Sequence, residues 1–299
     1  MRVKKTWKRV DGVLLLDKPI GLSSNDALQK ARRLFSAAKG GHTGTLDPMA
    51  TGLLPLCFGE ATKFSADLLD ADKTYEAVIK LGVTTDSGDA EGIVITTTTV
   101  DVSKNDISEV IPRFVGPIQQ IPPMHSALKL NGRPLYELAR QGIEVERQPR
   151  AVHIYQIDTF GFEGDLLTLR VACSKGTYIR VLAADIGAAL GCGAHLVGLR
   201  RTIVGELNLE NAITLAELEA MAEEDRPVRL QSVDALLHTL PIVQIEGAAA
   251  ERFRHGNPVE LPAGLVGKIR VYAGGLLLGV GEPGRDGLLW PKRLVQLPI

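Results

Sequence analysis

Cysteines are few in this chain, and long hydrophobic runs are missing. Its 299 residues include three cysteines, Cys57, Cys173 and Cys192, which are far apart and share no Cys-x-x-Cys spacing. That pattern fits neither a disulfide framework nor a zinc site, so we expect a reducing cytoplasm. The apolar stretches are a few residues long, whereas a membrane-spanning helix needs about 20. The sequence therefore predicts no membrane segment, and the basic first residues do not resemble a signal peptide.

A surplus of charge of one sign is also missing. Lys and Arg total 34 against 35 Asp and Glu, so the net charge is -1. This balance gives no overall attraction to nucleic acid, and any contact must come from local basic clusters. The six histidines are scattered without ligand spacing, and neither a P-loop nor a Gly-x-Gly-x-x-Gly follows a predicted strand. The sequence predicts chemistry without a metal or another cofactor.

The order of the predicted elements favours an α+β fold with a mixed, mainly antiparallel sheet. Hydrophobic patterns predict strands over 12–18, 75–81, 93–100, 152–157 and 166–173. They predict helices over about 24–35, 49 onward, 103–115, 134–141, 178–190 and 206–225. We expect 75–81 to pair with 93–100, Asn131-Gly132 to form a hairpin turn, and 191–198 to form a loop. The strands and helices do not alternate regularly, which argues against a parallel sheet.

The pattern of predicted elements changes after Pro241. Short β segments punctuated by glycine follow, over 241–245, 266–272, 276–281 and 288–295. This spacing predicts a small second domain that resembles a β-barrel. We therefore expect a basic arm over 1–10, a main domain over 11–238 and a small domain over 239–299.

One carboxylate, Asp47, lies in a loop rich in glycine and hydroxyl residues, Gly41-His42-Thr43-Gly44-Thr45-Leu46-Asp47-Pro48-Met49-Ala50-Thr51-Gly52. The glycines let the backbone turn and approach a ligand, while Pro48 biases Asp47 away from helix. An Asp before a proline is commonly only a turn residue. The neighbouring residues favour a reactive carboxylate here.

Three further places could supply groups that act with Asp47, one of which, Leu199-Arg200-Arg201, follows the 191–198 loop and adds positive charge near an apolar residue. Tyr75 begins a predicted strand, where it could pack in the core or stack on a base. The stretch Ser174-Lys175-Gly176-Thr177-Tyr178-Ile179-Arg180 turns from a strand into a helix, so its amides and cations could converge on an anion. Arg180 could pair with a carboxylate and hold it ionised, or it could lie on the surface. Together these residues favour covalent catalysis, in which a nucleophile attacks a glycosidic carbon or an electrophilic base.

An aspartic protease is the alternative that Asp86-Ser87-Gly88 raises. Such an enzyme needs two Asp-Thr/Ser-Gly segments, because its carboxylates share a proton. The chain has no second segment, and His42 stands where the acid of 42–44 would be. The protease reading is therefore disfavoured.

Over nearly its full length the chain resembles the bacterial pseudouridine synthases of the TruB class, which modify uridine 55 in the T-loop of tRNA. The resemblance includes 12–19, the loop 41–52, 59–63, 72–75, 121–129, 131–136, 174–180 and 191–196. It implies the pseudouridine synthase fold and, more loosely, a PUA-type RNA-binding domain over 239–299. It also implies an isomerase that flips the uridine out, cleaves its N-glycosidic bond and rejoins the base through C5.

By the same resemblance, Asp47 is the nucleophile, Tyr75 stacks on the flipped base and Arg180 forms a salt bridge with Asp47. Attack at C1′, addition at C6 and a glycal route all remain open. The other residues that the resemblance implies for RNA binding are His42, Tyr178, Leu199, Lys18 and Lys63. Lys18 and Lys63 are expected as phosphate or structural partners.

The expected partner is the T-arm of tRNA, bound by a monomer that needs no other protein. We expect a basic face made of the N-terminal arm, Arg32, Arg33, Lys39, Arg147, Arg150, Arg200 and Arg201, with the acids of 206–225 lying away from it. Two other functions are considered: a tRNA chaperone or RNP scaffold without chemistry, and an RNA-guided enzyme that requires partner proteins.

Overall fold

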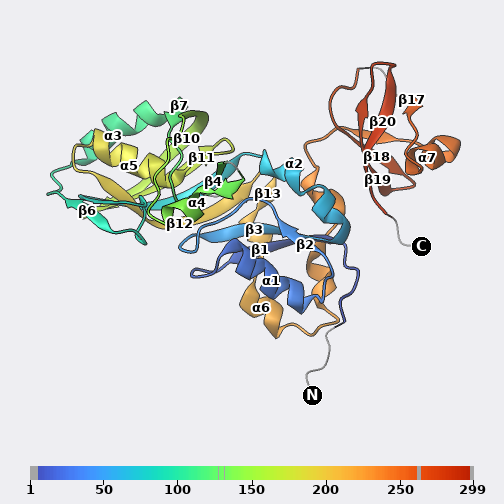
Figure 1. The fold of residues 1–299 in the computed structure, drawn as a ribbon, viewed down its shortest axis with the longest axis horizontal. Helices are drawn as coiled ribbons and strands as arrows, with labels where there is room; N and C mark the ends of the chain where they lie inside the picture. Colours follow the sequence, from blue (N-terminus) through green and yellow to red (C-terminus); the bar gives the residue numbers. More distant parts are fainter. Residues whose placement is uncertain (1–5, 127, 131, 261–263, 297–299) are drawn as a thin grey trace.

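A computed structural model describes residues 6–126, 128–130, 132–260 and 264–296. Most of the chain is built on one large sheet, and a smaller sheet near the C-terminus lies to its upper right (Figure 1). Within the described residues, no helix is both long and apolar enough to cross a membrane. The α+β fold with a mixed, mainly antiparallel sheet is confirmed.

The large sheet has eleven strands within the described residues, with a main order of β14-β1-β3-β12-β4-β11-β10-β7. They are β1 (Gly12–Lys18), β2 (Gly40–His42), β3 (Thr51–Phe58), β4 (Lys73–Leu81), β7 (Gly116–Gln120), β10 (Arg150–Glu163), β11 (Leu166–Cys173), β12 (Ala194–Val204), β13 (Leu207–Asn208), β14 (Ile213–Thr214) and β15 (Leu230–Gln231). Two small hairpins lie outside it, β5 (Val83–Thr85) with β6 (Val94–Thr97) and β8 (Lys129–Leu130) with β9 (Arg133–Pro134).

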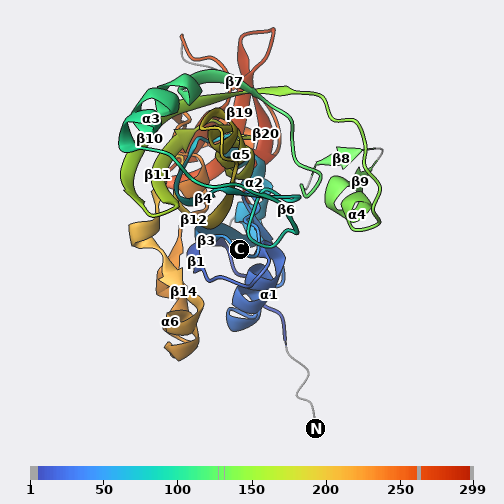
Figure 2. The ribbon, with the colours of Figure 1, turned by 90° about the vertical axis from the view of Figure 1, so that its left-hand side faces the viewer.

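The helices of the described residues are short. They are α1 (Ser24–Leu34), α2 (Ser65–Leu69), α3 (Lys104–Val110), α4 (Leu135–Ala139), α5 (Ile179–Ala189), α6 (Leu215–Ala220) and α7 (Gly247–Arg254). The 3₁₀ turns are η1 (Gly59–Lys63), η2 (Ile111–Phe114), η3 (Leu209–Asn211), η4 (Arg226–Arg229) and η5 (Val233–Leu236). The segment with β8, β9 and α4 extends away from the large sheet, as Figure 2 shows.

Strand β12 joins the two halves of the large sheet. It runs antiparallel to β4 on one side and parallel to β3 on the other, so Arg201 lies opposite both Tyr75 and Gly52. One apolar core gathers buried side chains of β4, β11, β12 and α5, and a second gathers those of β1, β3 and α1. The two halves are visible in Figure 1, with α3 and α5 on the left and α1 and α6 below β1 and β3. The loop before β3 and the start of β4 therefore meet at β12.

Local sequence signals place several elements well. Ser23 caps α1 by accepting a hydrogen bond from the Asp26 amide, and Ser103 caps α3 through a capping box with Asp106. Helix α5 ends before Gly191, whose φ of 79° suits the residue after a helix. Of the predicted hairpin turn, Asn131 lies outside the described residues, as do residues 1–5 of the basic arm.

Four predictions on local structure were wrong. The run 93–100 does not pair with β4, because β11 and β12 occupy both edges of β4 and β6 pairs with β5 instead. No helix starts near Met49, since a single turn leads directly into β3. Residues 194–198 are not loop, because β4 recruits them into β12. The only α-helix in 206–225 is the short α6, since β13, η3 and β14 precede it and Ile213 of β14 pairs with Leu16 of β1.

The C-terminal part forms a separate five-stranded sheet. Its strands are β16 (Ile242–Gln244), β17 (Val259–Glu260), β18 (Ile269–Ala273), β19 (Leu276–Pro283) and β20 (Leu288–Leu294), in the order β16-β18-β19-β20-β17. Helix α7, which the sequence did not reveal, packs on this sheet through the buried Phe253. Val280 of β19 also belongs to an apolar cluster with Val13 and Phe64 of the larger part, so the two parts are in direct contact.

Candidate active site

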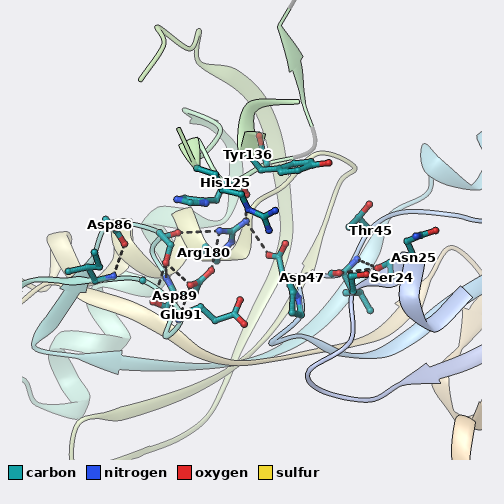
Figure 3. A pocket seen from close by; sticks show the side chains of 18 of the residues that line it. Ser24, Asn25, Thr45, Asp47, Asp86, Asp89, Glu91, His125, Tyr136 and Arg180 are labelled. Carbon is teal, nitrogen blue, oxygen red and sulfur yellow. Dashed lines mark hydrogen bonds and ion pairs between the residues drawn. The ribbon is translucent and has the colours of Figure 1, made fainter. Parts of the chain in front are cut away.

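The backbone on both sides of Asp47 is fixed. Ser24, in the first turn of α1, accepts a hydrogen bond from the Leu46 amide (2.7 Å) and donates one to the Leu46 carbonyl (3.0 Å). On the other side, the Pro48 carbonyl accepts a hydrogen bond from the Gly21 amide (2.8 Å). The side chain of Asp47 keeps 37% of its accessible surface and points into the cavity shown in Figure 3. A carboxylate on a fixed backbone is thus presented to a ligand.

Arg180 holds Asp47 from the opposite wall of the cavity. Its Nη2 lies 3.1 Å from Oδ2 of Asp47 and donates a hydrogen bond to the His125 carbonyl at 2.7 Å. Its Nη1 lies 3.1 Å from Oδ2 of Asp89 and donates to the Ser87 carbonyl at 3.3 Å. Only 6% of the Arg180 side chain is exposed. A guanidinium with so many fixed acceptors gives Asp47 a rigid partner.

Asp89 is a residue of the site that sequence reasoning missed. It is buried, and beyond Arg180 it accepts hydrogen bonds from the Ser87 hydroxyl (2.5 Å) and the Glu91 amide (3.1 Å). Figure 3 shows Arg180 between Asp89 and Asp47. In the sequence, Asp89 follows Asp86-Ser87-Gly88, which indicated only a possible protease motif. No spacing in the sequence connects this segment with Arg180.

Asp47 lies where two cavities meet. The larger, of about 620 Å³, is lined by His42, Asp47, His125, Tyr136 and Arg180, among others. The smaller, of about 270 Å³, brings Asp47 and Arg180 together with Tyr75, Lys73, Tyr178, Leu199 and Arg201. The structure thus gathers Asp47, Tyr75, Arg180, Tyr178 and Leu199 around one space, while His42 lines the adjoining one.

The surroundings shift the pKa values of four of these groups; for Tyr178, burial raises the pKa. Burial raises the pKa of Asp47, and the nearby Asp89 adds to the rise, while the charges of Arg180 and Lys18 oppose it. Burial likewise raises the pKa of Tyr75, against the charge of Arg201. Burial and the charge of Arg201 lower the pKa of His42, which favours its neutral form. The site therefore places the Asp47 carboxylate close to three uncharged rings, those of Tyr75, Tyr178 and His42.

The two predicted lysines lie outside these cavities. Lys18 is fully buried, and its ammonium donates to the carbonyls of Pro19 (2.9 Å), Leu22 (2.7 Å) and Pro48 (3.5 Å). Burial lowers its pKa to about 8. Lys63 donates to Glu60 (2.6 Å) and to the Leu294 carbonyl of β20 (2.9 Å). In this structure the ammonium groups of both residues are bonded to other parts of the chain.

The expected basic face needs correction at two points. Arg201 is 1% exposed and belongs to the interior of the site. The acids of 206–225 do not lie away from the arm, because Glu223 forms an ion pair with Lys8 at 3.2 Å and α6 lies beside α1. No group of three or more His, Cys, Asp or Glu in the described part of the chain is arranged to hold a metal ion.

Comparisons with known proteins agree with this geometry. Residues 32–179 match the family described as "TruB family pseudouridylate synthase (N terminal domain)". Residues 180–240 match "tRNA pseudouridylate synthase B C-terminal domain", and 241–295 match "Pseudouridine synthase II TruB, C-terminal". The chain is 78% identical over 297 residues to tRNA pseudouridine synthase B of Dechloromonas aromatica, covering 99% of both proteins. It is 56% identical to that of Aromatoleum aromaticum over 287 residues, 96% of this chain and 93% of that protein.

Solved structures show the same fold. A Cbf5-Nop10-Gar1 complex contains a chain with 30% identity and a TM-score of 0.69, matched over 91% of this chain and 78% of that one. An H/ACA RNP bound to a substrate RNA contains another, with 26% identity and a TM-score of 0.73, over 96% and 85%. The fold and the site thus define a pseudouridine synthase, which is an isomerase. Within that class, the chain belongs to the TruB family.

Proposed function

We propose that this protein isomerises the T-loop uridine 55 of tRNA to pseudouridine. The observation that carries the proposal is the ion pair of 3.1 Å between Asp47 and Arg180 in a cavity that Tyr75 also lines. Family membership supports the reaction class, and the relatives named tRNA pseudouridine synthase B support the substrate. In the reaction the bond between N1 and C1′ breaks, C5 bonds to C1′, the C5 proton leaves and N1 gains a proton, so that the product is an isomer of the substrate.

Each predicted site residue has a role in this proposal. Asp47 is the nucleophile, and Arg180 keeps it ionised against the burial that raises its pKa. Tyr75 stacks on the flipped base, while Tyr178 and Leu199 line the same space. His42, neutral and lining the adjoining cavity, contacts the neighbouring nucleotides of the loop.

The remaining features of the proposal concern the whole chain. It comprises a basic arm over 1–10, the catalytic domain over 11–238 and a PUA-type RNA-binding domain over 239–299. The protein acts in the cytoplasm as a monomer, without a guide RNA or an obligatory protein partner. The high identity to tRNA pseudouridine synthase B supports this assignment over the RNP proteins that share the fold.

Tritium release from a tRNA transcript labelled at uridine C5 tests the proposal directly. The wild-type protein should release tritium from bare transcript, whereas Asp47→Asn should bind the transcript with the same affinity and release none. Loss of the nucleophile should lower the rate by at least about 10⁴-fold, a loss of the size seen for other nucleophiles.

Two results would contradict the proposal. Tight binding without release by the wild type would identify a tRNA chaperone. Equal release by both proteins would show that Asp47 is not the nucleophile. A transcript that carries the C5 label at uridines other than uridine 55 is the control for position. Release of tritium from it would contradict the assignment to uridine 55.

A further inference from the structure

Arg201 is a buried arginine at the centre of the site, where the sequence predicted a surface residue. On β12 it lies directly opposite Tyr75 of β4 and, on the other side, opposite Gly52 of β3. Residues directly opposite on paired antiparallel strands project to the same face of the sheet. Accordingly, Arg201 and Tyr75 both line the smaller cavity with Asp47.

The guanidinium of Arg201 is fixed to the backbone that carries the Asp47 loop. Its Nε donates to the Leu53 carbonyl at 2.8 Å, and its Nη2 donates to the Gly44 carbonyl at 3.2 Å. Gly44 lies three residues before Asp47, and Leu53 lies in β3, which follows the loop. The side chain of Arg201 thus connects β12, which pairs with the strand that bears Tyr75, to the loop that bears Asp47.

Within the described residues, Arg201 forms no ion pair with a carboxylate, so its buried charge is balanced only by backbone carbonyls. Burying a charge without a counter-charge costs free energy, so its retention at 1% exposure calls for a reason. Its charge reaches other groups of the site, because it lowers the pKa values of His42 and Lys73 after the larger effect of burial. No carboxylate within the described residues pairs with the Arg201 guanidinium. Its positive charge therefore acts on the neighbouring groups of the site.

We infer that Arg201 is a positioning residue for Tyr75: bonded to the Asp47 loop, its guanidinium holds the Tyr75 hydroxyl in place against the uracil ring. Burial raises the pKa of Tyr75, and the charge of Arg201 and a hydrogen bond from it oppose that rise. The register of β12 against β4 and the shared cavity place the Arg201 guanidinium beside Tyr75, where it can donate to the hydroxyl. This inference rests on the proposed function.

The test is a double-mutant cycle on single-turnover tritium release at saturating tRNA. Arg201→Met, which removes every donor while keeping a long apolar stem, should lower the rate by about 100-fold, as loss of a fixed donor does elsewhere. The dissociation constant for tRNA should stay unchanged, and Arg201→Lys should show an intermediate rate. In the Tyr75→Phe background, Arg201→Met should have little further effect, because the group it acts through is gone.

Arg270→Met provides the matched control. Arg270 is also buried, bonds to the carbonyls of Leu240 and His238 at 3.0 Å, and lies near Tyr272 in the C-terminal sheet. It should keep the wild-type rate. An equal loss from Arg201→Met in both Tyr75 backgrounds would overturn the inference, since it would show a general structural role.

A spectroscopic measurement decides the matter if the Tyr75→Phe proteins release no tritium. With ¹³Cζ-labelled tyrosine, the resonance of Tyr75, assigned by its loss in Tyr75→Phe, should move in Arg201→Met. An unmoved resonance would overturn the inference. Neither result depends on whether the wild type isomerises uridine, so failure of the proposed function is recognised separately by absent wild-type release.

Discussion

The partly buried, ionised carboxyl of Asp47 is required for the proposed reaction but lowers the stability of the fold. A carboxyl whose pKa is raised by folding costs stability in its ionised form, and that cost disappears as the pH falls through the folded-state value. Asp47→Asn removes the charge, so near neutral pH its melting temperature should equal or exceed that of the wild type. The difference should shrink in acid, as calorimetry at a series of pH values would show.

The same shift predicts the acid limb of the wild-type activity. The nucleophile must be ionised, so tritium release should decline as the pH falls. Because the pKa of Asp47 is raised, this decline should begin at a higher pH than it would for an aspartate with an ordinary pKa. A variant that melts below the wild type at every pH would contradict this account of Asp47.

Single residues differ in how far their sequence neighbours reveal them. The glycine- and hydroxyl-rich loop around Asp47 and the polar turn before the helix of Arg180 are visible in the sequence. Both residues could therefore be selected from the sequence as candidates. Asp89 has no such local signal, and for Arg201 the sequence shows only a basic pair, Arg200-Arg201, that follows a predicted loop. Asp89 becomes part of the site only through its 3.1 Å contact with Arg180, and Arg201 only because β12 lies between two strands.

At the scale of elements, Gly52 decides how closely β3 and β12 approach. Its φ is 98°, and a Cβ added there would lie 2.3 Å from the carbonyl oxygen of Arg201. Gly52→Ala should therefore destabilise the protein by about 1–3 kcal/mol and slow the reaction, because it pushes Arg201 away from the Asp47 loop. Urea unfolding and tritium release measure both effects.

Gly41→Ala is the control for Gly52→Ala. Gly41 lies in the neighbouring strand β2 at the same loop, its φ is not positive, and an added Cβ would meet no atom within 4 Å. It should be nearly neutral. Equal effects of the two substitutions would show that the approach of β12 to β3 is not what Gly52 provides.

Elements with a local signal were predicted well, and their pairing was not. The strand over 12–18 and the helix caps at Ser23 and Ser103 follow from residues within a few positions of each other. Which strand lies beside β4 depends on competition among all strands, and β11 and β12 bury more apolar surface there than the exposed run 93–95 could. The pairing is a property of the assembled sheet.

For the whole molecule, the distribution of charge decides how tRNA binds. Arg150 is exposed, and it lies close enough to the cavity to oppose the rise that burial causes in the pKa of Tyr178. Arg150→Met should weaken tRNA binding and reduce the slope of log affinity against log salt by about 1. Filter binding over a range of salt concentrations measures that slope.

Lys63→Met is the matched comparison for Arg150→Met. Its ammonium is engaged by Glu60 and the Leu294 carbonyl, so the salt slope should not change, although contact between the two parts of the chain should loosen. A slope reduced as much by Lys63→Met as by Arg150→Met would mean that Lys63 binds phosphate after all.

The sequence by itself determined many of the strands and helices, the α+β class and the separate C-terminal sheet, because periodicity, caps and turns act over a few residues. It also determined which side chains are able to react. Only the tertiary structure decided which of them meet: β12 between β3 and β4 brings the Asp47 loop to Tyr75, and Asp89 to Arg180. That arrangement depends on burial summed over distant segments, which no local pattern contains.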